Sequence, residues 1–280
     1  MPTAGRSRPV AQAALPGGNA EHFAGYAILA VPFASGDVLA MRRWTATSIS
    51  PAQISVWHRS PDGEWTFYSN VAPVQSCARY FSSAAARTSQ TPIDLTWEND
   101  RAFRVRISGG VDLDWRLTLA STHVTALMNA LAGVLPEPVW RMPWFLRVMG
   151  RVASVALAAG RLRLDGRVPN GQRFLANPRR IWMVSASQAS LGGVSFGAMA
   201  PLPTQTHLAD FWLPQRGIFA LAQAFIEPYN ATSHTLPSGA LSISPPGTET
   251  RGTRSARHHS HRRAWRAGPA DDRRGLRRAQ

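Results

Sequence analysis

The chain has 280 residues, and its 44% hydrophobic content is that of a globular protein, not of a disordered or membrane-embedded one. Its formal net charge of +15 comes from 31 basic residues, all of them arginine. The lack of lysine in the sequence excludes a Schiff-base lysine, a P-loop lysine and a Ser–Lys nucleophile pair. The single cysteine, Cys77, excludes an intrachain disulfide and a cysteine-rich metal site.

The first residues predict an arm without regular structure. Residues 1–21 are small, polar and rich in glycine and proline, which is typical of a disordered terminus. The apolar run Val10–Leu15 is shorter than the core of a secretory signal. No stretch reaches the roughly 18–20 uncharged apolar residues of a membrane span. We therefore expect a cytoplasmic protein.

Residues 22–120 predict a first β block. Tyr26–Phe33 and Asp37–Ser48 are expected as strands, and Gln53–Val71 as an antiparallel hairpin. Two alternating runs flank Ser60-Pro61-Asp62-Gly63, where proline presets φ, aspartate bonds its own backbone and glycine takes a positive φ. This is the clearest local structure in the sequence.

Pro92–Ala120 predicts a three-stranded meander, because its side chains alternate between apolar and charged across turns at Asn99-Asp100 and Gly109-Gly110. The charged face is the wet side of an open sheet, or the lining of a cavity if the sheet closes. We favour the wet side. Trp115 and Arg116, on opposite faces, are candidates for ligand contact.

After Ala120 the apolar residues no longer alternate with a period of two, and residues 121–160 predict a helical hairpin. Its helices are expected at Ser121–Val134, with Ser121 or Thr122 as the N-terminal cap, and at Pro143–Ala159, and prolines separate the two. The second helix is basic and widely apolar, with Arg147 and Arg151 on one stripe. It could bind an anionic membrane surface, but packing on the sheet is the favoured interpretation.

Residues 161–229 predict a second β block packed on the first. Strands are expected at Arg161–Arg167 and Ile181–Ser187, with a turn at Asn177-Pro178, and Gly217–Glu227 is expected as a final strand or a short helix. The order of strands, two helices and strands predicts a β-rich α+β fold. Its antiparallel sheets are lipocalin-like or barrel-like, with a two-helix insertion near residues 121–159.

Residues 230–280 predict a disordered tail. Its last 30 residues hold ten arginines and two acids, net +8, whereas residues 1–250 hold 21 arginines and 14 acids, net +7. We favour translation of GC-rich DNA beyond a shifted frame or lost stop over a functional basic tail that binds nucleic acid or metal. No nucleic-acid motif accompanies it, so no specific nucleic-acid partner is expected.

Asp210 and His58 are the candidate catalytic residues, as proton carriers. Asp210 belongs to Leu208–Gly217, a short stretch that also holds Trp212 and Arg216 and that we expect at the mouth of a pocket. His58 lies in the predicted hairpin, and histidine titrates near neutral pH. A structural role for each is the alternative.

The candidate ligand-binding residues are aromatic and arginine side chains of the predicted strands and of this stretch. They are Trp57, Tyr68, Trp115, Arg116, Trp212 and Arg216. No metal-ligating pattern or cofactor motif is present, so neither a metal nor a cofactor is expected.

Three segments resemble an uncharacterised protein family of GC-rich bacteria: Trp57–Gly63 (WHRSPDG), Pro169–Gln172 (PNGQ) and Asp210–Gly217 (DFWLPQRG). The tryptophan-rich strands in two blocks are also similar to the lipocalin-like carotenoid hydratase (hydroxyneurosporene synthase) group. That likeness is one of architecture. The helical segment 121–159 departs from the nearly all-β pattern of the group, and no catalytic residue is carried over.

The function predicted from these features is binding of an apolar small molecule, lipid or isoprenoid-like, in a β-barrel-like pocket. One alternative is an acid–base enzyme of the hydratase or isomerase type that uses the same pocket. The other is a membrane-surface or scaffold protein that uses the helix at residues 143–159. The sequence carries no indication of oligomeric state.

Overall fold

The computed structural model describes residues 18–234. Most of the predicted arm and tail, including all of residues 251–280, lies outside this part of the chain. The strands are β1 (Glu21–Pro32), β2 (Val38–Thr47), β3 (Gln53–Arg59), β4 (Trp65–Ser69), β5 (Arg87–Gln90), β6 (Ile93–Trp97), β7 (Ala102–Ile107), β8 (Leu113–Ala120), β9 (Asp165–Arg167), β10 (Arg173–Leu191), β11 (Val194–Ser195), β12 (His207–Leu208), β13 (Phe211–Trp212) and β14 (Ile218–Ile226). The α-helices are α1 (Ala78–Phe81), α2 (His123–Val134) and α3 (Pro143–Ala156), and short 3-10 turns occupy Pro73–Gln75, Ser82–Ala84 and Glu137–Arg141.

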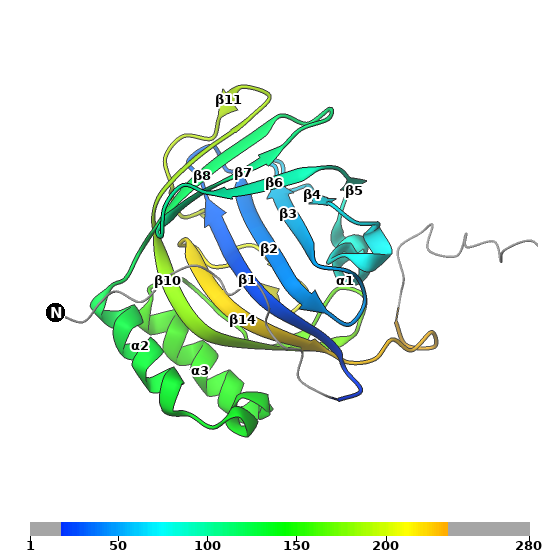
Figure 1. Ribbon diagram of the computed structural model, residues 1–280, viewed down its shortest axis with the longest axis vertical. Helices are drawn as coiled ribbons and strands as arrows, with labels where there is room; N and C mark the ends of the chain where they lie inside the picture. The colour runs from blue at the N-terminus through cyan, green and yellow to red at the C-terminus, as the bar shows by residue number, and fades with distance from the viewer. Residues whose placement is uncertain (1–17, 235–280) are drawn as a thin grey trace, which may run out of the picture. The chain divides into compact units, whose positions relative to one another are not determined.

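One curled sheet holds twelve of the strands, in the order β5-β4-β3-β2-β1-β14-β10-β8-β7-β6, with β9 and β11 pairing to β10 (Figure 1). Its neighbours are antiparallel except β4 and β5. The strands β12 and β13 form a separate small hairpin. The predicted β-rich, barrel-like fold with few helices is confirmed.

Two strands from the second half of the chain lie in the middle of this sheet. β14 pairs with β1 on one side and with β10 on the other, and β10 continues the sheet to β8. The strands predicted as a second block are therefore hydrogen-bonded between the two ends of the first. The 19-residue β10 pairs first with β14 and then with β8, so it joins the two parts.

The predicted hairpin and meander are confirmed. β3 and β4 pair across the turn at Gly63, whose φ of 95° is in the region that glycine favours. β6, β7 and β8 pair in sequence. Alternating polarity and turn residues are local signals, so the elements that they predict do not depend on how distant segments pair.

The predicted turn at Asn177-Pro178 is wrong. Both residues lie inside β10, where the pairing with β14 shifts register between Pro178 and Arg180. A proline has no N–H to donate to a sheet ladder, and a bulge lets the strand continue past it. The strand predicted at Arg161–Arg167 is also shorter, since only Asp165–Arg167 pairs.

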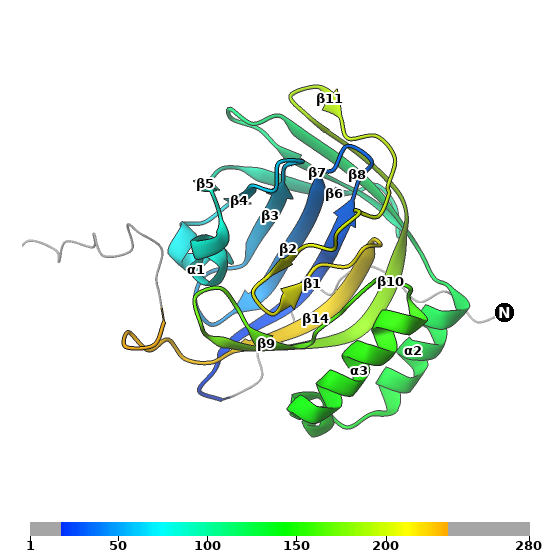
Figure 2. The same cartoon turned by 180° about the vertical axis from the view of Figure 1, so that it is seen from behind.

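The two long helices pack beside β10 (Figures 1 and 2). The N-terminus of α2 is capped by Thr122, whose side chain accepts from the backbone N–H of Thr125, as expected for the predicted start. α3 ends at Ala156, three residues earlier than predicted. Gly150 lets α3 approach the following segment closely, because a Cβ there would lie 2.9 Å from the carbonyl oxygen of Leu162.

The sheet has two faces of different character. The aromatic face, defined by Tyr26, Phe103, Trp115 and Phe219, forms a dense core in which side chains from distant strands meet. The opposite face, defined by Ala27, Arg42, Ala176, Ala222 and Ala224, is called here the small-residue face. Residues from α1, α3 and the β12–β13 hairpin pack over it. Figure 2 shows this covered side, with α1 beside β3 and α3 beyond β10.

Candidate functional site

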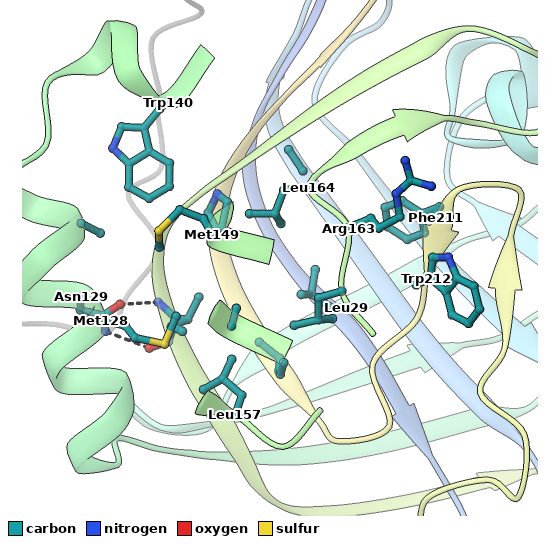
Figure 3. Close-up of a pocket in the computed structure, with 17 residues that line it drawn as sticks. Leu29, Met128, Asn129, Trp140, Met149, Leu157, Arg163, Leu164, Phe211 and Trp212 are labelled. Carbon is teal, nitrogen blue, oxygen red and sulfur yellow. Dashed lines mark hydrogen bonds between the residues drawn. The ribbon is translucent and has the colours of Figure 1, made fainter. Parts of the chain in front are cut away.

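Two adjoining apolar pockets lie between the small-residue face and the segments that cover it. The first, called the Arg42 pocket, is a cavity of about 80 Å³ lined by residues of β1, β2, β3, β10, α1 and β14. The second, called the helix pocket, is also about 80 Å³ and lies between the sheet and α2 and α3 (Figure 3). Both are lined by Leu29, Ala176 and Phe211, so they are neighbours.

The space exists because the floor of the pockets is made of small side chains. On β14, alanine occupies every second position from Ala220 to Ala224, and Ala27 and Ala176 stand on the neighbouring strands. Alternate residues of a strand share a face, so these alanines are adjacent across the sheet. Tightly packed interiors have few voids, and short side chains here leave volume beneath the covering aromatic rings.

The polar group of the Arg42 pocket is the guanidinium of Arg42, in the middle of β2. Its residue is only 4% exposed. Nη1 donates to the main-chain oxygens of Ile28 and Met41, and Nη2 donates to that of Leu29 at 3.3 Å. The guanidinium carbon lies 4.6 Å from the ring centre of Trp57, a cation–π distance.

No acidic residue lines the Arg42 pocket, and among residues 18–234 Arg42 forms no ion pair. Burial lowers the pKa of the guanidinium to about 10, so it remains a cation at neutral pH. Burial raises the pKa of the nearby Cys77 thiol, which therefore stays neutral and leaves the charge uncompensated. A buried charge without a partner is costly, which makes Arg42 the most unusual group of the described structure.

The helix pocket is lined mainly by aliphatic and aromatic side chains. Figure 3 shows Met128, Trp140, Met149 and Leu157 around it. The amide of Asn129 fixes α2 to β10: Nδ2 donates to the oxygen of Ile181 at 2.9 Å, and Oδ1 accepts from its N–H at 2.8 Å. These bonds hold one wall of the pocket at a defined distance from the sheet.

Phe211 of β13 lines both pockets. Its ring centre lies 5.5 Å from those of Phe81 and Phe174, and 5.5 Å from the guanidinium carbon of Arg42. Trp212, the next residue, lines the helix pocket. The predicted pocket-mouth stretch Leu208–Gly217 thus contacts both cavities through its aromatic residues.

The polar residues of that stretch bond to the protein. Asp210 pairs with Arg163 and accepts from the backbone N–H of Arg167 at 3.0 Å. Arg216 donates to the oxygen of Leu157 at 3.3 Å. Asp210 lines neither pocket, nor does Arg216. The roles predicted for both remain predictions.

His58 lies away from the two pockets. Its Nε2 is 2.6 Å from Oδ1 of Asp37, both residues are buried, and the ring stacks on Phe196 with centroids 5.4 Å apart. His58 pairs with Leu39 on the side of the sheet opposite to Trp57. The two predicted proton carriers, His58 and Asp210, are therefore in separate places.

The remaining candidate residues divide between the pocket, the core and the surface. Trp57 lines the Arg42 pocket. Tyr68 and Trp115 belong to the aromatic core, where Nε1 of Trp115 donates to Oγ of Ser187 at 2.8 Å. Arg116 pairs with Glu98 on the charged side of the meander, and its side chain is 51% exposed. That side is wet, as expected.

Sequence reasoning missed the alanine floor, Phe211 and Arg42. The sequence did contain a signal for Arg42. Val38–Met41, the four residues before it, are all apolar, which indicates a buried strand, and an arginine at the centre of a buried strand is itself buried. The alternation of alanine in Ile218–Ile226 was a second signal. Neither says what lies above the strand, which depends on segments far away in the chain.

Within residues 18–234, no helix has the length and apolar character needed to cross a bilayer. The same part of the chain contains no group of three or more His, Cys, Asp or Glu residues arranged to hold a metal ion.

Comparisons with known proteins add little to this geometry. No family model matches the chain, and no curated protein matches it. The resemblance to the carotenoid hydratase group therefore receives no support. Among solved structures, the chain is similar to an acetoacetate decarboxylase from Legionella pneumophila subsp. pneumophila str. Philadelphia 1, with 8% identity and a TM-score of 0.35. The match covers 78% of this chain and 88% of that one. A likeness at this level carries no argument about activity.

Proposed function

We propose that this protein binds an apolar small molecule in the Arg42 pocket and the adjoining helix pocket. The observation that carries the proposal is the alanine floor, which leaves two neighbouring apolar cavities beneath the segments that cover the sheet. Ligand sites are typically concave and apolar, with a few polar groups that fix orientation. Here those groups include Arg42 and Asn129.

The composition of the lining favours binding over acid–base chemistry. Neither pocket is lined by Asp, Glu or His. A general acid or base must lie within hydrogen-bond reach of the proton that it transfers. The hydratase or isomerase alternative would therefore need a proton carrier from outside the lining, and Asp210 already accepts from Arg163 and Arg167.

Filling the floor tests the proposal. Ala176 lines both pockets, so Ala176→Leu should remove ligand binding, whereas Ala86→Leu at an exposed position should not. Binding is measured by displacement of an environment-sensitive apolar dye, and folding by circular dichroism. Native mass spectrometry of protein purified from its own host would identify a retained ligand. Dye binding that persists unchanged in folded Ala176→Leu contradicts the proposal.

A second candidate function is binding to an anionic lipid surface through α2 and α3. These helices expose large apolar side chains: Val124, Leu127, Leu131, Val134, Trp144, Val148, Val152 and Val155. Arg147 and Arg151 lie among them, and α3 contains no acidic residue. Apolar side chains flanked by arginines favour an interface of lipid acyl chains and anionic headgroups.

Vesicle flotation tests the second candidate. The protein should float with phosphatidylglycerol vesicles and not with phosphatidylcholine vesicles. Trp144→Ser together with Val148→Ser should abolish flotation, whereas Val194→Ser, which alters a 70% exposed valine of β11, should leave it unchanged. Equal flotation of the double variant and the parent chain would exclude α3 as the lipid-binding face.

A further inference from the structure

The guanidinium of Arg42 has binding capacity that the protein does not use. An arginine side chain offers five N–H donors, and three are occupied here by main-chain oxygens of Ile28, Met41 and Leu29. The other two have no partner within residues 18–234. Carbonyl oxygens orient the side chain but carry no net charge, so the positive charge is held in place without being neutralised.

The carboxylate of Glu21 already has two partners within the protein. Glu21 is the carboxylate at the far side of Tyr80, which lines the Arg42 pocket. Its two oxygens accept from the hydroxyl of Tyr80 and from Nη2 of Arg79 at 2.9 Å. Cys77 is the other titratable neighbour, and burial keeps it protonated. No described side chain supplies the counter-charge of Arg42.

We propose that the counter-charge comes from the ligand: Arg42 receives the carboxylate of a monocarboxylic acid whose apolar tail occupies the rest of the two pockets. The proposal rests on the proposed function, because it names the ligand class of the same site. Two free donors on a planar guanidinium match the two oxygens of one carboxylate. A doubly charged phosphate would leave one charge without a partner in an apolar cavity.

The tail has a defined route. The Arg42 pocket alone holds a group of only a few heavy atoms, since its cavity is about 80 Å³. A longer chain must pass the ring of Phe211, over Leu29 and Ala176, into the helix pocket beside Met149. Phe211 is therefore the residue that sets chain length, and the ligand is an aliphatic acid with its head at Arg42 and its tail toward α3.

The test compares one acid with its neutral analogue. Octanoate and octanol are titrated at neutral pH into the full-length protein by isothermal calorimetry. The parent chain should bind octanoate about ten- to hundredfold more tightly, the effect of hydrogen bonds to a charged group. Arg42→Met should lose that preference while octanol affinity changes by less than about twofold. Arg43→Met, on the opposite face of β2, is the matched control and should behave as the parent.

The outcomes separate the two proposals. If octanol and octanoate bind the parent equally well, the pocket binds apolar molecules but the carboxylate assignment is overturned. If neither binds and Ala176→Leu changes nothing, the pocket itself is not a ligand site. The comparison of octanoate with octanol in the parent chain needs no variant, so it decides the assignment even if Arg42→Met fails to fold. Phe211→Ala should shift the preferred acid toward longer chains, and an unchanged preference excludes the proposed tail route.

Discussion

The two faces of one strand show how this protein makes both a core and a pocket. On β14, Phe219 and Leu221 point into the aromatic face, while Ala220, Ala222 and Ala224 point the other way. The two faces share one backbone and the same pairing with β1 and β10, apart from the bulge at Pro178–Arg180, so the main difference between them is side-chain volume. Large residues fill one side completely, and small ones leave room on the other.

The two faces also differ in whether their buried polar atoms have hydrogen-bond partners. In the aromatic core, Nε1 of Trp115 has Ser187 as partner. On the small-residue face, Nε1 of Trp57 and both amide atoms of Gln53 are buried and have no partner within residues 18–234. Most buried polar groups in proteins are satisfied, so these three atoms are exceptions on the face that holds the pockets.

The largest expected effect is on the aromatic face. Phe219 packs against Tyr26, Trp97, Phe103 and Trp182. Phe219→Ala should lower the free energy of unfolding by about 3–5 kcal/mol, because it removes a buried ring and leaves a cavity. Urea denaturation followed by tryptophan fluorescence measures it. A loss below about 1 kcal/mol would show that this core is not the main source of stability.

A matched pair of substitutions compares the two faces directly. Trp115→Phe and Trp57→Phe remove the same atoms, but only Trp115 loses a hydrogen bond. Trp115→Phe should therefore destabilise by about 1 kcal/mol more than Trp57→Phe in the same denaturation assay. Equal losses would mean that the indole N–H of Trp57 is satisfied in solution.

The thiol on the small-residue face should be inert. Burial raises the pKa of Cys77, and the thiolate is the reactive form. Alkylation of the native protein by iodoacetamide should be slower than alkylation of the urea-unfolded chain, and the difference should persist at mildly alkaline pH. Comparable rates in the two states would show that the Arg42 pocket opens readily, which would weaken the contrast between its face and the solvent-exposed meander.

The smallest expected effect is on the charged side of the β6–β8 meander, which continues the small-residue face but is exposed to solvent. There the side chain of Asp114 accepts from Arg104, and this hydrogen bond holds the pKa of the carboxyl below its usual range. A lowered folded-state pKa stabilises the protein above the unfolded-state pKa and is lost as pH falls through the folded-state value. The pair is about one-third exposed, so solvent screens it. Asp114→Asn should therefore lower the melting temperature slightly at neutral pH, and the difference from the parent chain should disappear as the pH falls through the folded-state pKa of Asp114. A large loss at neutral pH would contradict this.

Local signals predicted much of the fold. The turn at Ser60–Gly63, the alternation in Pro92–Ala120 and the cap at Thr122 each depend on a few neighbouring residues, and each is confirmed. Asn177-Pro178 was misassigned because a proline in a strand is rare and its accommodation depends on a bulge against β14. The conformation of Asn177-Pro178 is set by pairing with a distant strand and not by the local turn propensity of the two residues.

The candidate site was less predictable than the fold. Trp57 and Trp212 were named, and both line pockets. Arg42 was passed over because an arginine in a strand usually reaches water, whereas here the rings of Trp57 and Phe211 lie against its guanidinium and the residue is buried. Burial is a property of the assembled structure, so a single strand cannot reveal it.

The sequence by itself determined the hairpin at Gln53–Val71, the meander at Pro92–Ala120 and the two long helices, because backbone sterics and side-chain alternation act over a few residues. It also determined that alanine occupies every second position of β14 from Ala220 to Ala224. Only the tertiary structure decided that β14 and β10 lie between β1 and β8, and that α1, α3 and β13 cover the small-residue face. Those contacts join residues far apart in the chain, and they alone turn a row of alanines and one arginine into a pocket with a buried positive charge.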